Sequence, residues 1–347
     1  MKPDNGILLI GNFLSHAGFP RGVCEDLSER LQKTGWDVIT TSHKPGRLPR
    51  LFDILTTIWR KRDLFSVAHV DVFSGLAFFW AEASCWLLRR LNKPFSLTLH
   101  GGNLPLFACR WPGRIHRLLV SAAAVTTPSN YLVEAMRSYR QDIRLIPNPI
   151  DLAAYPFRLR FRPKPRLIWL RSFHSIYNPV LASRVLAALL PHFPNTTLTM
   201  IGPDKGDGSL QKTLEVACKL NVMEHIRFVG GVPKVDVPLW LNQGDIFINT
   251  TNMDNFPVSV IEAMACGLCI VSTDVGGIPC LLKDEHDALL VPPNNPLEMA
   301  SDIRRILTEP GLAERLSLNA RHKSEQFDWK VILPQWESLF RELISLA

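Results

Sequence analysis

The sequence has no apolar segment long enough to cross a bilayer. Its longest apolar stretch, Gly75 to Leu88, is interrupted by Glu82, whereas a transmembrane helix needs about 20 consecutive apolar residues. The first residues also lack the pattern of a secretory signal peptide, because Asp4 and Asn5 interrupt them early. We therefore expect a cytoplasmic protein and not one that spans a membrane by helices.

The cysteines form no disulfide framework. The chain has seven of them, an odd number without the regular spacing of small secreted domains, and this favours a reducing compartment. Cys266 and Cys269 have the spacing of a redox or metal motif, but they fall at the end of a predicted helix and in a predicted strand. We interpret these two as packing residues.

Length and charge limit the class of protein further. With 347 residues, 46% of them hydrophobic and 20% charged, the chain is an ordinary globular protein with room for two domains. A formal charge of +7 favours an anionic partner such as a nucleotide, a nucleic acid or an anionic lipid. No nucleic-acid recognition motif stands out, so we do not expect nucleic acid as the partner.

Short apolar runs alternate with helical segments along the whole chain. The predicted strands are Ile7–Ile10, Val38–Ile39, Pro94–His100, Ala122–Thr127, Ile143–Ile146, Leu167–Leu170, Thr196–Ile201, Ile226–Val229, Asp245–Asn249 and Leu268–Ser272. Segments with helical apolar spacing separate them, among them Val23–Lys33, Val180–Leu190 and Leu210–Leu220. This alternation predicts an α/β protein with parallel sheets and right-handed crossovers.

One stretch, Asn252 to Gly277, combines a phosphate site with acceptors for hydroxyl groups. Polar residues and Pro257 lead into a predicted helix, Val258–Cys266. The unpaired N–H groups at a helix N-terminus suit a phosphate. Asp254 and Glu262 add two carboxylates, which accept hydrogen bonds from sugar hydroxyls. Phosphate and hydroxyl groups in one ligand indicate a nucleotide sugar.

The residues of this stretch resemble a known family. Asp254-x7-Glu262, followed by Ala263-Met-Ala-Cys-Gly267 and Asp274-Val-Gly-Gly277, is similar to the E-x7-E region of family 4 of the retaining glycosyltransferases. Aspartate replaces the usual first glutamate and keeps its charge. The resemblance implies the GT-B architecture, in which two Rossmann-like domains with parallel sheets face each other across a cleft and a C-terminal helix crosses back to the N-domain.

On this basis we expect three segments. Residues 1–155 form an acceptor-side Rossmann-like domain, and residues 156–326 form the domain that binds the donor nucleotide sugar. Residues 327–347 form a helix that packs back on the N-domain, since apolar residues from Ile332 to Leu343 lie on one side of the predicted helix Trp329–Leu346. A turn at Pro147–Asp151 is the expected hinge.

The resemblance also assigns roles to single residues. His100 ends a predicted strand and precedes two glycines, where ligand sites of α/β proteins open; in the family, a histidine here faces the donor sugar. Arg171 corresponds to an arginine that grips the donor diphosphate. Together with Asp254, expected at the sugar across from His100, these are the expected catalytic residues. The expected donor-binding residues are Gly18, Gly202, Asn255, Phe256, Pro257, Val258, Ser259 and Glu262, the last at the ribose hydroxyls.

Three positions depart from the family pattern. Phe19 stands where the second glycine of a Gly-Gly pair usually lies. Pro149 replaces a glycine and stiffens the expected hinge. Tyr177 replaces a lysine that contacts the diphosphate, and a tyrosine can hydrogen-bond a phosphate but brings no charge. Lys205 and Lys234 are candidates to supply the missing cation.

The resemblance implies a retaining glycosyltransferase. Such an enzyme moves a hexosyl or N-acetylhexosaminyl group from a nucleotide-diphosphate sugar to a hydroxyl of a sugar or lipid-linked acceptor, in the synthesis of a glycolipid or a cell-surface polysaccharide or glycoconjugate. The sequence has no Asp-x-Asp pair placed to hold a cation at a diphosphate, so we expect neither a metal nor another cofactor. Two alternatives remain: a non-catalytic nucleotide-sugar-binding protein, and a nucleotide-sugar epimerase on a related double-Rossmann fold.

The segment Leu48–Arg62 predicts a basic amphipathic helix. Its apolar residues at helical spacing are Leu48, Leu51, Phe52, Leu55, Ile58 and Trp59, and its basic residues and neighbours are Arg47, Arg50, Arg60, Lys61 and Arg62. Such a helix either lies in an anionic membrane surface or packs on the sheet of the N-domain with its arginines in water. A second basic cluster, Arg110 to Arg117, favours the membrane. We therefore expect peripheral attachment to the inner face of an anionic membrane.

Overall fold

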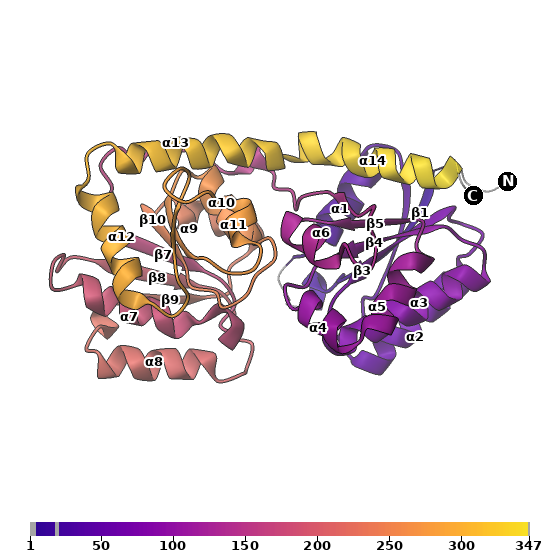
Figure 1. Ribbon diagram of the computed structural model, residues 1–347, viewed down its shortest axis with the longest axis horizontal. Helices are drawn as coiled ribbons and strands as arrows, with labels where there is room; N and C mark the ends of the chain where they lie inside the picture. Colours follow the sequence, from indigo (N-terminus) through magenta and orange to yellow (C-terminus); the bar gives the residue numbers. More distant parts are fainter. Residues whose placement is uncertain (1–4, 18–20, 346–347) are drawn as a thin grey trace. The chain divides into compact units, whose positions relative to one another are not determined.

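The computed structural model describes residues 5–17 and 21–345 and divides into two compact units (Figure 1). Unit 1 is built from the chain up to Pro149 and again from Lys330 onward, and unit 2 extends from Ile150 to Trp329. The sequence placed these boundaries at residues 155/156 and 326/327. Within the described residues, no helix is both long and apolar enough to cross a membrane.

Unit 1 contains a six-stranded parallel sheet with the strand order β2-β1-β3-β4-β5-β6. Its strands are β1 (Gly6–Ile10), β2 (Asp37–Thr41), β3 (Val67–Val72), β4 (Phe95–Leu99), β5 (Ala124–Thr127) and β6 (Arg144–Leu145). Helices cover both faces, which is why most of these strands are apolar runs without alternation. The last strand is shorter than the predicted Ile143–Ile146, because only Arg144 and Leu145 pair with β5.

The helices of unit 1 form one layer on each face of its sheet (Figure 1). One layer contains α2 (Arg47–Arg60), α3 (Phe78–Arg90), α4 (Leu104–Arg110), α5 (Pro112–Ser121) and α6 (Asn130–Met136). The other contains α1 (Val23–Lys33) and α14 (Trp329–Ser345). Helix α2 therefore packs on the sheet, as one of the two sequence interpretations of this segment expected.

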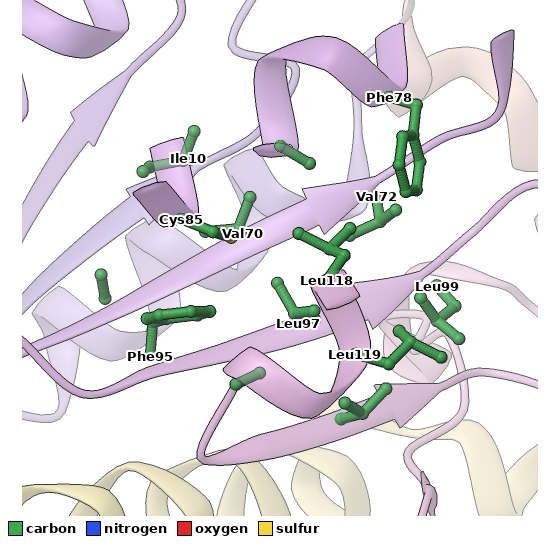
Figure 2. Packing of buried hydrophobic residues seen from close by; sticks show 14 of the residues in the cluster. Ile10, Val70, Val72, Phe78, Cys85, Phe95, Leu97, Leu99, Leu118 and Leu119 are labelled. Carbon is green, nitrogen blue, oxygen red and sulfur yellow. The ribbon is translucent and has the colours of Figure 1, made fainter. Parts of the chain in front are cut away.

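Figure 2 shows the core between the sheet of unit 1 and its larger helix layer. The labelled side chains are Ile10 of β1, Val70 and Val72 of β3, Phe95, Leu97 and Leu99 of β4, Phe78 and Cys85 of α3, and Leu118 and Leu119 of α5. Burial of a large aliphatic or aromatic side chain stabilises a fold by about 1.5–3 kcal/mol. This core therefore fixes the carboxyl ends of β3 and β4, where polar residues follow.

Helix α14 covers the opposite face of the sheet of unit 1. Trp336 meets the ring of His69 edge to face at 5.0 Å between ring centroids, and Phe340 meets Trp36 at 5.9 Å. The buried residues of this helix are Trp329, Ile332, Trp336, Leu339, Phe340 and Leu343. They recur at the spacing of one helix face, as the sequence predicted for the last helix.

Unit 2 contains a second six-stranded parallel sheet, with the strand order β12-β11-β10-β7-β8-β9. Its strands are β7 (Arg166–Leu170), β8 (Thr197–Ile201), β9 (Ile226–Gly230), β10 (Ile246–Asn249), β11 (Cys269–Thr273) and β12 (Leu289–Val291). Its helices are α7 (Pro179–Leu189), α8 (Ser209–Lys219), α9 (Val237–Leu241), α10 (Val258–Ala265), α11 (Ile278–Leu281), α12 (Pro296–Thr308) and α13 (Leu312–Ser324). Cys266 and Cys269 are fully buried here, and burial raises the pKa of each thiol to about 12, which fits a packing role.

Candidate functional site

The loop between β10 and α10 carries Asp254 and rests on two glycines that follow β11. The N–H of Gly277 donates to the carbonyl oxygen of Asp254 at 2.9 Å. A Cβ added to Gly276 would lie 2.3 Å from that oxygen, and one added to Gly277 would lie 1.9 Å from the carbonyl oxygen of Asn255. No side chain fits at such distances, so both glycines are required where the two backbones approach. The DVGG motif therefore positions the loop that holds Asp254.

Arg171 directly follows β7 and forms an ion pair with Asp254. Its Nη2 contacts Oδ2 of the carboxylate, and the side chains are only 15% and 14% exposed. Burial lowers the pKa of Arg171 below its ordinary value, while Tyr177 and Glu262 partly oppose this shift. Among the described residues, the Nε of Arg171 has no hydrogen-bond partner. This buried donor is available to an anionic ligand.

Tyr177, which replaces the family lysine, stacks on the guanidinium group of Arg171. The Cζ atom of Arg171 lies 4.3 Å from the centre of the ring. The Oγ1 of Thr250 donates to the carbonyl oxygen of Tyr177 at 2.8 Å and holds the turn η4 (Ser175–Tyr177). A cation over an aromatic face gains about 0.5–2 kcal/mol. The ring therefore orients the arginine, a role that the sequence did not indicate.

Glu262 lies in α10, and its carboxylate is buried between two donors. The Nζ of Lys234 forms an ion pair with Oε1, and the hydroxyl of Tyr155 donates to the same oxygen at 2.5 Å. Lys234 begins the turn η6 (Lys234–Asp236) that precedes α9. A carboxylate has about four acceptor positions, so two donors leave capacity for hydroxyl groups of a ligand. Of the two lysines suggested by the sequence, Lys234 thus contacts a site carboxylate.

The N-terminus of α10 carries a buried hydroxyl group. Helix α10 begins at Val258, directly after Pro257, as the sequence predicted. The Oγ of Ser259 is buried and has no hydrogen-bond partner among the described residues. Free backbone N–H groups and a hydroxyl at the positive end of a helix suit a phosphate oxygen.

Two other expected donor-binding residues have structural contacts. The ring of Phe256 meets that of Phe327 edge to face at 5.4 Å and belongs to the core of unit 2. The N–H of Asn255 donates to Oδ1 of Asp254 at 2.8 Å, which turns the carboxylate back over its own loop. These contacts shape the loop.

The two glycines of the expected donor site differ in what the structure describes. Gly202 follows β8 with φ near 149°, and a Cβ there would lie 1.8 Å from the carbonyl oxygen of Arg171. Gly202 is therefore required because the backbone at Arg171 lies too close for a side chain. This packing explains the glycine without a role in donor binding. Gly18 lies outside the described residues.

In unit 1, His100 is held by an aspartate from the neighbouring strand. Asp71 lies in β3, and its Oδ1 is 2.8 Å from Nε2 of His100 and 3.5 Å from Nε2 of His69. The ring of His100 also stacks on Phe73, with 5.2 Å between the centroids. Burial alone would raise the pKa of Asp71, but the two histidines outweigh it and hold that pKa well below its usual range.

A small cavity lies beside this cluster in unit 1. Its lining includes Cys24 of α1, His69, Asp71, His100, the Pro147–Pro149 turn and Trp336 of α14. Gly11 lies just after β1. A Cβ added to it would lie only 2.6 Å from Oδ2 of Asp71, so a glycine is needed here. The carboxyl ends of β1, β3 and β4 therefore meet around one ordered histidine, and this is the edge where parallel α/β sheets bind ligands.

Sequence reasoning missed Asp71 and Tyr155, and it named Lys234 without placing it at Glu262. Asp71 can be recognised from the sequence, because an acidic residue in the mostly apolar segment Val67–Val72 needs a partner. Tyr155 and Lys234 have no such signal, since they lie 107 and 28 positions from Glu262 in the sequence. Only the fold brings them to its carboxylate.

No group of three or more His, Cys, Asp and Glu side chains that could hold a metal ion occurs among residues 5–17 and 21–345. The expectation of metal-independent transfer therefore remains a prediction, and it is tested by experiment below.

Two family models match the chain. The model described as "Glycosyl transferases group 1" matches residues 156–323, and the model described as "Glycosyltransferase Family 4" matches residues 21–154. The chain belongs to the family 4 glycosyltransferases. The resemblance inferred from Asp254-x7-Glu262 and the two following motifs is thus confirmed, and the two models divide the chain close to the boundary between its two units.

Curated relatives of this glycosyltransferase carry the names of different enzymes. The chain is 30% identical over 132 residues to a D-inositol 3-phosphate glycosyltransferase of Streptomyces bingchenggensis, covering 38% of this chain and 29% of that protein. It is 27% identical over 202 residues to a glycogen synthase of Mycobacterium tuberculosis, covering 55% of this chain and 46% of that protein. The matched region therefore spans less than half of either relative.

Solved structures of similar fold cover nearly the whole chain. Sucrose-phosphate synthase from Thermosynechococcus elongatus matches with a TM-score of 0.82 at 19% identity, covering 99% of this chain and all of that one. Anabaena HepE matches with a TM-score of 0.77 at 15% identity, covering 97% of this chain and 99% of that one. These likenesses confirm the fold class expected for this glycosyltransferase, a GT-B-like protein with two Rossmann-like α/β units.

Proposed function

We propose that this glycosyltransferase moves a sugar from a nucleotide-diphosphate sugar to an acceptor hydroxyl, with retention of the anomeric configuration. One observation carries the proposal: two carboxylate–cation pairs, Arg171–Asp254 and Lys234–Glu262, adjoin helix α10 and its N-terminal loop. A nucleotide-diphosphate sugar offers both phosphate oxygens for the cations and hydroxyl groups for the carboxylates.

Unit 2 supplies groups suited to the leaving nucleoside diphosphate. Charge develops on the diphosphate as its bond to the sugar breaks, and donors that are already in place stabilise this charge most. Such donors are the Nε of Arg171, which has no hydrogen-bond partner in residues 5–17 and 21–345, the Oγ of Ser259 and the N–H groups of α10. Glu262 would accept from the ribose hydroxyls. Complexes of HepE with UDP and with UDP-glucose support a sugar nucleotide as the donor.

Unit 1 supplies His100, which we propose to act at the transferred sugar. Its hydrogen bond with Asp71 and its stacking on Phe73 fix the ring, so that its Nδ1 edge is oriented before a ligand arrives. We assign no protein nucleophile. Catalysis would come from stabilisation of the leaving diphosphate and from positioning of the acceptor hydroxyl.

The substrate class follows from the proposed chemistry and its relatives. We propose transfer of a hexosyl or N-acetylhexosaminyl group, without a metal, to a sugar or lipid-linked acceptor in glycolipid or cell-surface polysaccharide synthesis. The D-inositol 3-phosphate glycosyltransferase and the glycogen synthase among the relatives support a carbohydrate acceptor. The protein would work in the cytoplasm, at the inner face of a membrane.

One observation favours a second candidate, a non-catalytic nucleotide-sugar-binding protein. Tyr177 occupies the position of the family lysine and carries no charge, so neutralisation of the diphosphate depends more heavily on Arg171. A single test separates the two functions. Thermal unfolding is measured with UDP-, GDP-, ADP- and TDP-sugars, because a cognate donor stabilises the fold by mass action, and the stabilising donor is then assayed for release of nucleoside diphosphate with glycan and lipid acceptors.

We expect one class of nucleotide sugar to stabilise the protein against thermal unfolding. We also expect the protein to release the nucleoside diphosphate of that donor only when an acceptor is present. Stabilisation without release for any acceptor would support the binding protein. Interconversion of the sugar without an acceptor would support an epimerase. No stabilisation by any nucleotide sugar would refute the proposed function.

A further inference from the structure

Helix α2 has apolar residues on both of its faces. Ile54 and Ile58 point into the core of unit 1 and are buried. Leu48, Phe52 and Trp59 recur at helical spacing on the other face and are 79%, 71% and 55% exposed. The outward face of a helix on a globular protein is usually polar. The exposed apolar face of α2 therefore needs an explanation other than packing on the sheet.

The neighbouring helices of this layer also expose apolar side chains. Helix α3 packs beside α2 and exposes Phe79 and Trp86, each by just over half, and Leu76 lies in the turn directly before it. Helix α5 lies next to α3 and exposes Val120. Figure 1 shows α2, α3 and α5 on one side of the sheet of unit 1. We call the outward side of these three helices the α2–α3–α5 face.

Arginines cover the exposed tryptophans of the α2–α3–α5 face. The Cζ of Arg62 lies 4.9 Å from the ring centre of Trp59, and that of Arg90 lies 5.6 Å from the ring of Trp86. Each pair places a guanidinium group beside an aromatic ring at the surface. Tryptophan favours the interface between headgroups and acyl chains, and arginine binds phosphate.

The charge of the α2–α3–α5 face is basic, because its arginines outnumber its carboxylates. Asp63, shortly after α2, lies 3.8 Å from Nε of Arg62 and pairs with it. Glu82 accepts a bidentate pair from Arg114, and Asp53 accepts from the backbone N–H groups of Ser42 and His43. Between Glu82 and Glu134 the chain has no acidic residue. A groove between α3 and α5 is lined by Trp86, Arg89, Arg114, His116, Arg117 and Val120.

The structure places Arg50 differently from what the sequence predicted. It was expected beside the apolar stripe of α2, but the structure buries it. Its Nη2 donates to the carbonyl oxygen of Gly11 at 3.1 Å, and its side chain also contacts Ser42 and Asn12. It is therefore unable to reach a surface ligand, and the basic character comes from residues at the C-terminal end of α2 and from α3 and α5.

We propose that unit 1 docks on an anionic bilayer through the α2–α3–α5 face. Phe52, Trp59, Phe79 and Trp86 enter the interfacial region. The arginines beside the tryptophans bind lipid phosphates, together with Arg89 and Arg117 of the α3–α5 groove. The charge pattern selects this partner, since apolar side chains are interleaved with Arg89, Arg90 and Arg117, which form no ion pair within the described part of the chain. Such a surface matches acyl chains beneath a layer of phosphate. This docking goes beyond sugar transfer and does not require it.

The test is co-sedimentation of the full chain with vesicles of phosphatidylcholine alone and of phosphatidylcholine with phosphatidylglycerol. Two double variants disrupt both arginine–tryptophan pairs: Trp59→Ser with Trp86→Ser, and Arg62→Gln with Arg90→Gln. Unit 2 offers a matched control, because Arg162 lies 5.7 Å from the ring of the exposed Phe161. Phe161→Ser with Arg162→Gln therefore removes the same kind of pair elsewhere. Thermal unfolding without vesicles shows whether each variant folds.

The expected result is binding to anionic vesicles that falls with salt and is weak on neutral ones. Each basic residue near an anionic surface contributes roughly fivefold in affinity, so loss of two arginines lowers vesicle binding about 30-fold. Loss of the two tryptophans lowers it at least as much on anionic vesicles, and the control pair leaves it unchanged.

Three outcomes would overturn the proposal. The first is no binding to anionic vesicles, and the second is equal binding to both kinds of vesicle. The third is self-association of the wild type in solution that the tryptophan variant abolishes, because the face would then be an interface between copies of the chain. Catalysis does not enter any of these measurements, so failure of the proposed transferase activity would leave the result intact.

Discussion

The ring of Tyr177 lies 4.3 Å from the guanidinium carbon of Arg171, and the same arginine is ion-paired with Asp254. The position that carries a lysine in the resembling family thus supplies an aromatic surface here. Asp254 is therefore ion-paired with an arginine whose orientation an aromatic ring supports. The predictions for the donor site follow from this arrangement.

Removal of the Tyr177 ring is expected to weaken donor binding through Arg171. The stacking contact is worth about 0.5–1 kcal/mol at a partly exposed site, so Tyr177→Ala raises the KM for the donor about two- to fivefold. Tyr177→Phe keeps the ring and serves as the control, with a KM close to that of the wild type. If Phe and Ala substitutions raise the KM equally, the hydroxyl and not the stacked ring is the contributing group.

The two carboxylates are expected to affect different halves of the donor. Loss of a carboxylate that accepts from a ligand hydroxyl costs roughly 1.5–3 kcal/mol, so Glu262→Ala weakens nucleoside diphosphate and intact donor alike in calorimetry. Asp254→Ala leaves nucleoside diphosphate binding nearly intact and depresses turnover. Asp254→Glu is tolerated far better than Asp254→Asn. Equal weakening of nucleoside diphosphate by both alanine variants would contradict this division.

Lys234 is expected to orient Glu262 for the nucleotide. Its ion pair holds a carboxylate that is 3% exposed, and without it the carboxylate loses one of its two observed donors. Lys234→Ala therefore weakens nucleoside diphosphate binding about three- to tenfold, in line with a charge-assisted hydrogen bond. Lys212 is exposed on helix α8, and Lys212→Ala is the control. Tighter binding by Lys234→Ala would mean that the lysine blocks the carboxylate.

The buried Asp71 predicts a pH dependence of stability in unit 1. Its pKa in the folded protein lies below the ordinary value of about 3.9, so its charge stabilises the fold fully above that pH. This stabilisation is lost as pH falls through the depressed pKa. Asp71→Asn therefore costs about 1–3 kcal/mol between pH 5 and 7, and the difference from wild type narrows below about pH 4.

Hydrogen exchange of β3 and β4 amides measures this difference within unit 1, because it reports the opening of these strands. Amides of β10 and β11 in unit 2 are the internal control and are expected to exchange alike in both proteins. A difference that stays constant down to pH 2 would show that the Asp71 charge contributes nothing.

Transfer is expected to proceed without a divalent cation. Arg171 and the N-terminus of α10 would supply the positive charge that a leaving diphosphate needs. Nucleoside diphosphate release should therefore be the same in EDTA as in buffer alone. Activity that disappears in EDTA and returns with manganese would contradict this prediction.

Local patterns predicted much of the fold, because strands and helices of an α/β protein leave clear hydrophobic periods. Helix α10, its start after Pro257 and the glycines behind Asp254 all follow from such local signals. Contacts between distant segments do not follow from local signals. The pair of Asp71 and His100 depends on the register of β3 against β4, and the stacking of Tyr177 depends on the path of a turn after β7.

Helix α2 is a second case in which the sequence did not determine the structure. Apolar spacing in its sequence identified a helix, but two interpretations explained that spacing equally well. The structure assigns Ile54 and Ile58 to the core and Leu48, Phe52 and Trp59 to the surface. A stripe wide enough to cover two faces is indistinguishable, in sequence, from a single broad face.

Helix α14 has a consequence for how the protein is made. It follows all of unit 2 in the chain, yet its Trp336 and Phe340 cover His69 and Trp36 in unit 1. On the ribosome, the first sheet therefore emerges early, and one of its faces is covered by α1 alone while the intervening residues of unit 2 are synthesised. Unit 2 can close during translation, but unit 1 is completed only after the last helix leaves the exit tunnel, and until then this face is open to chaperones.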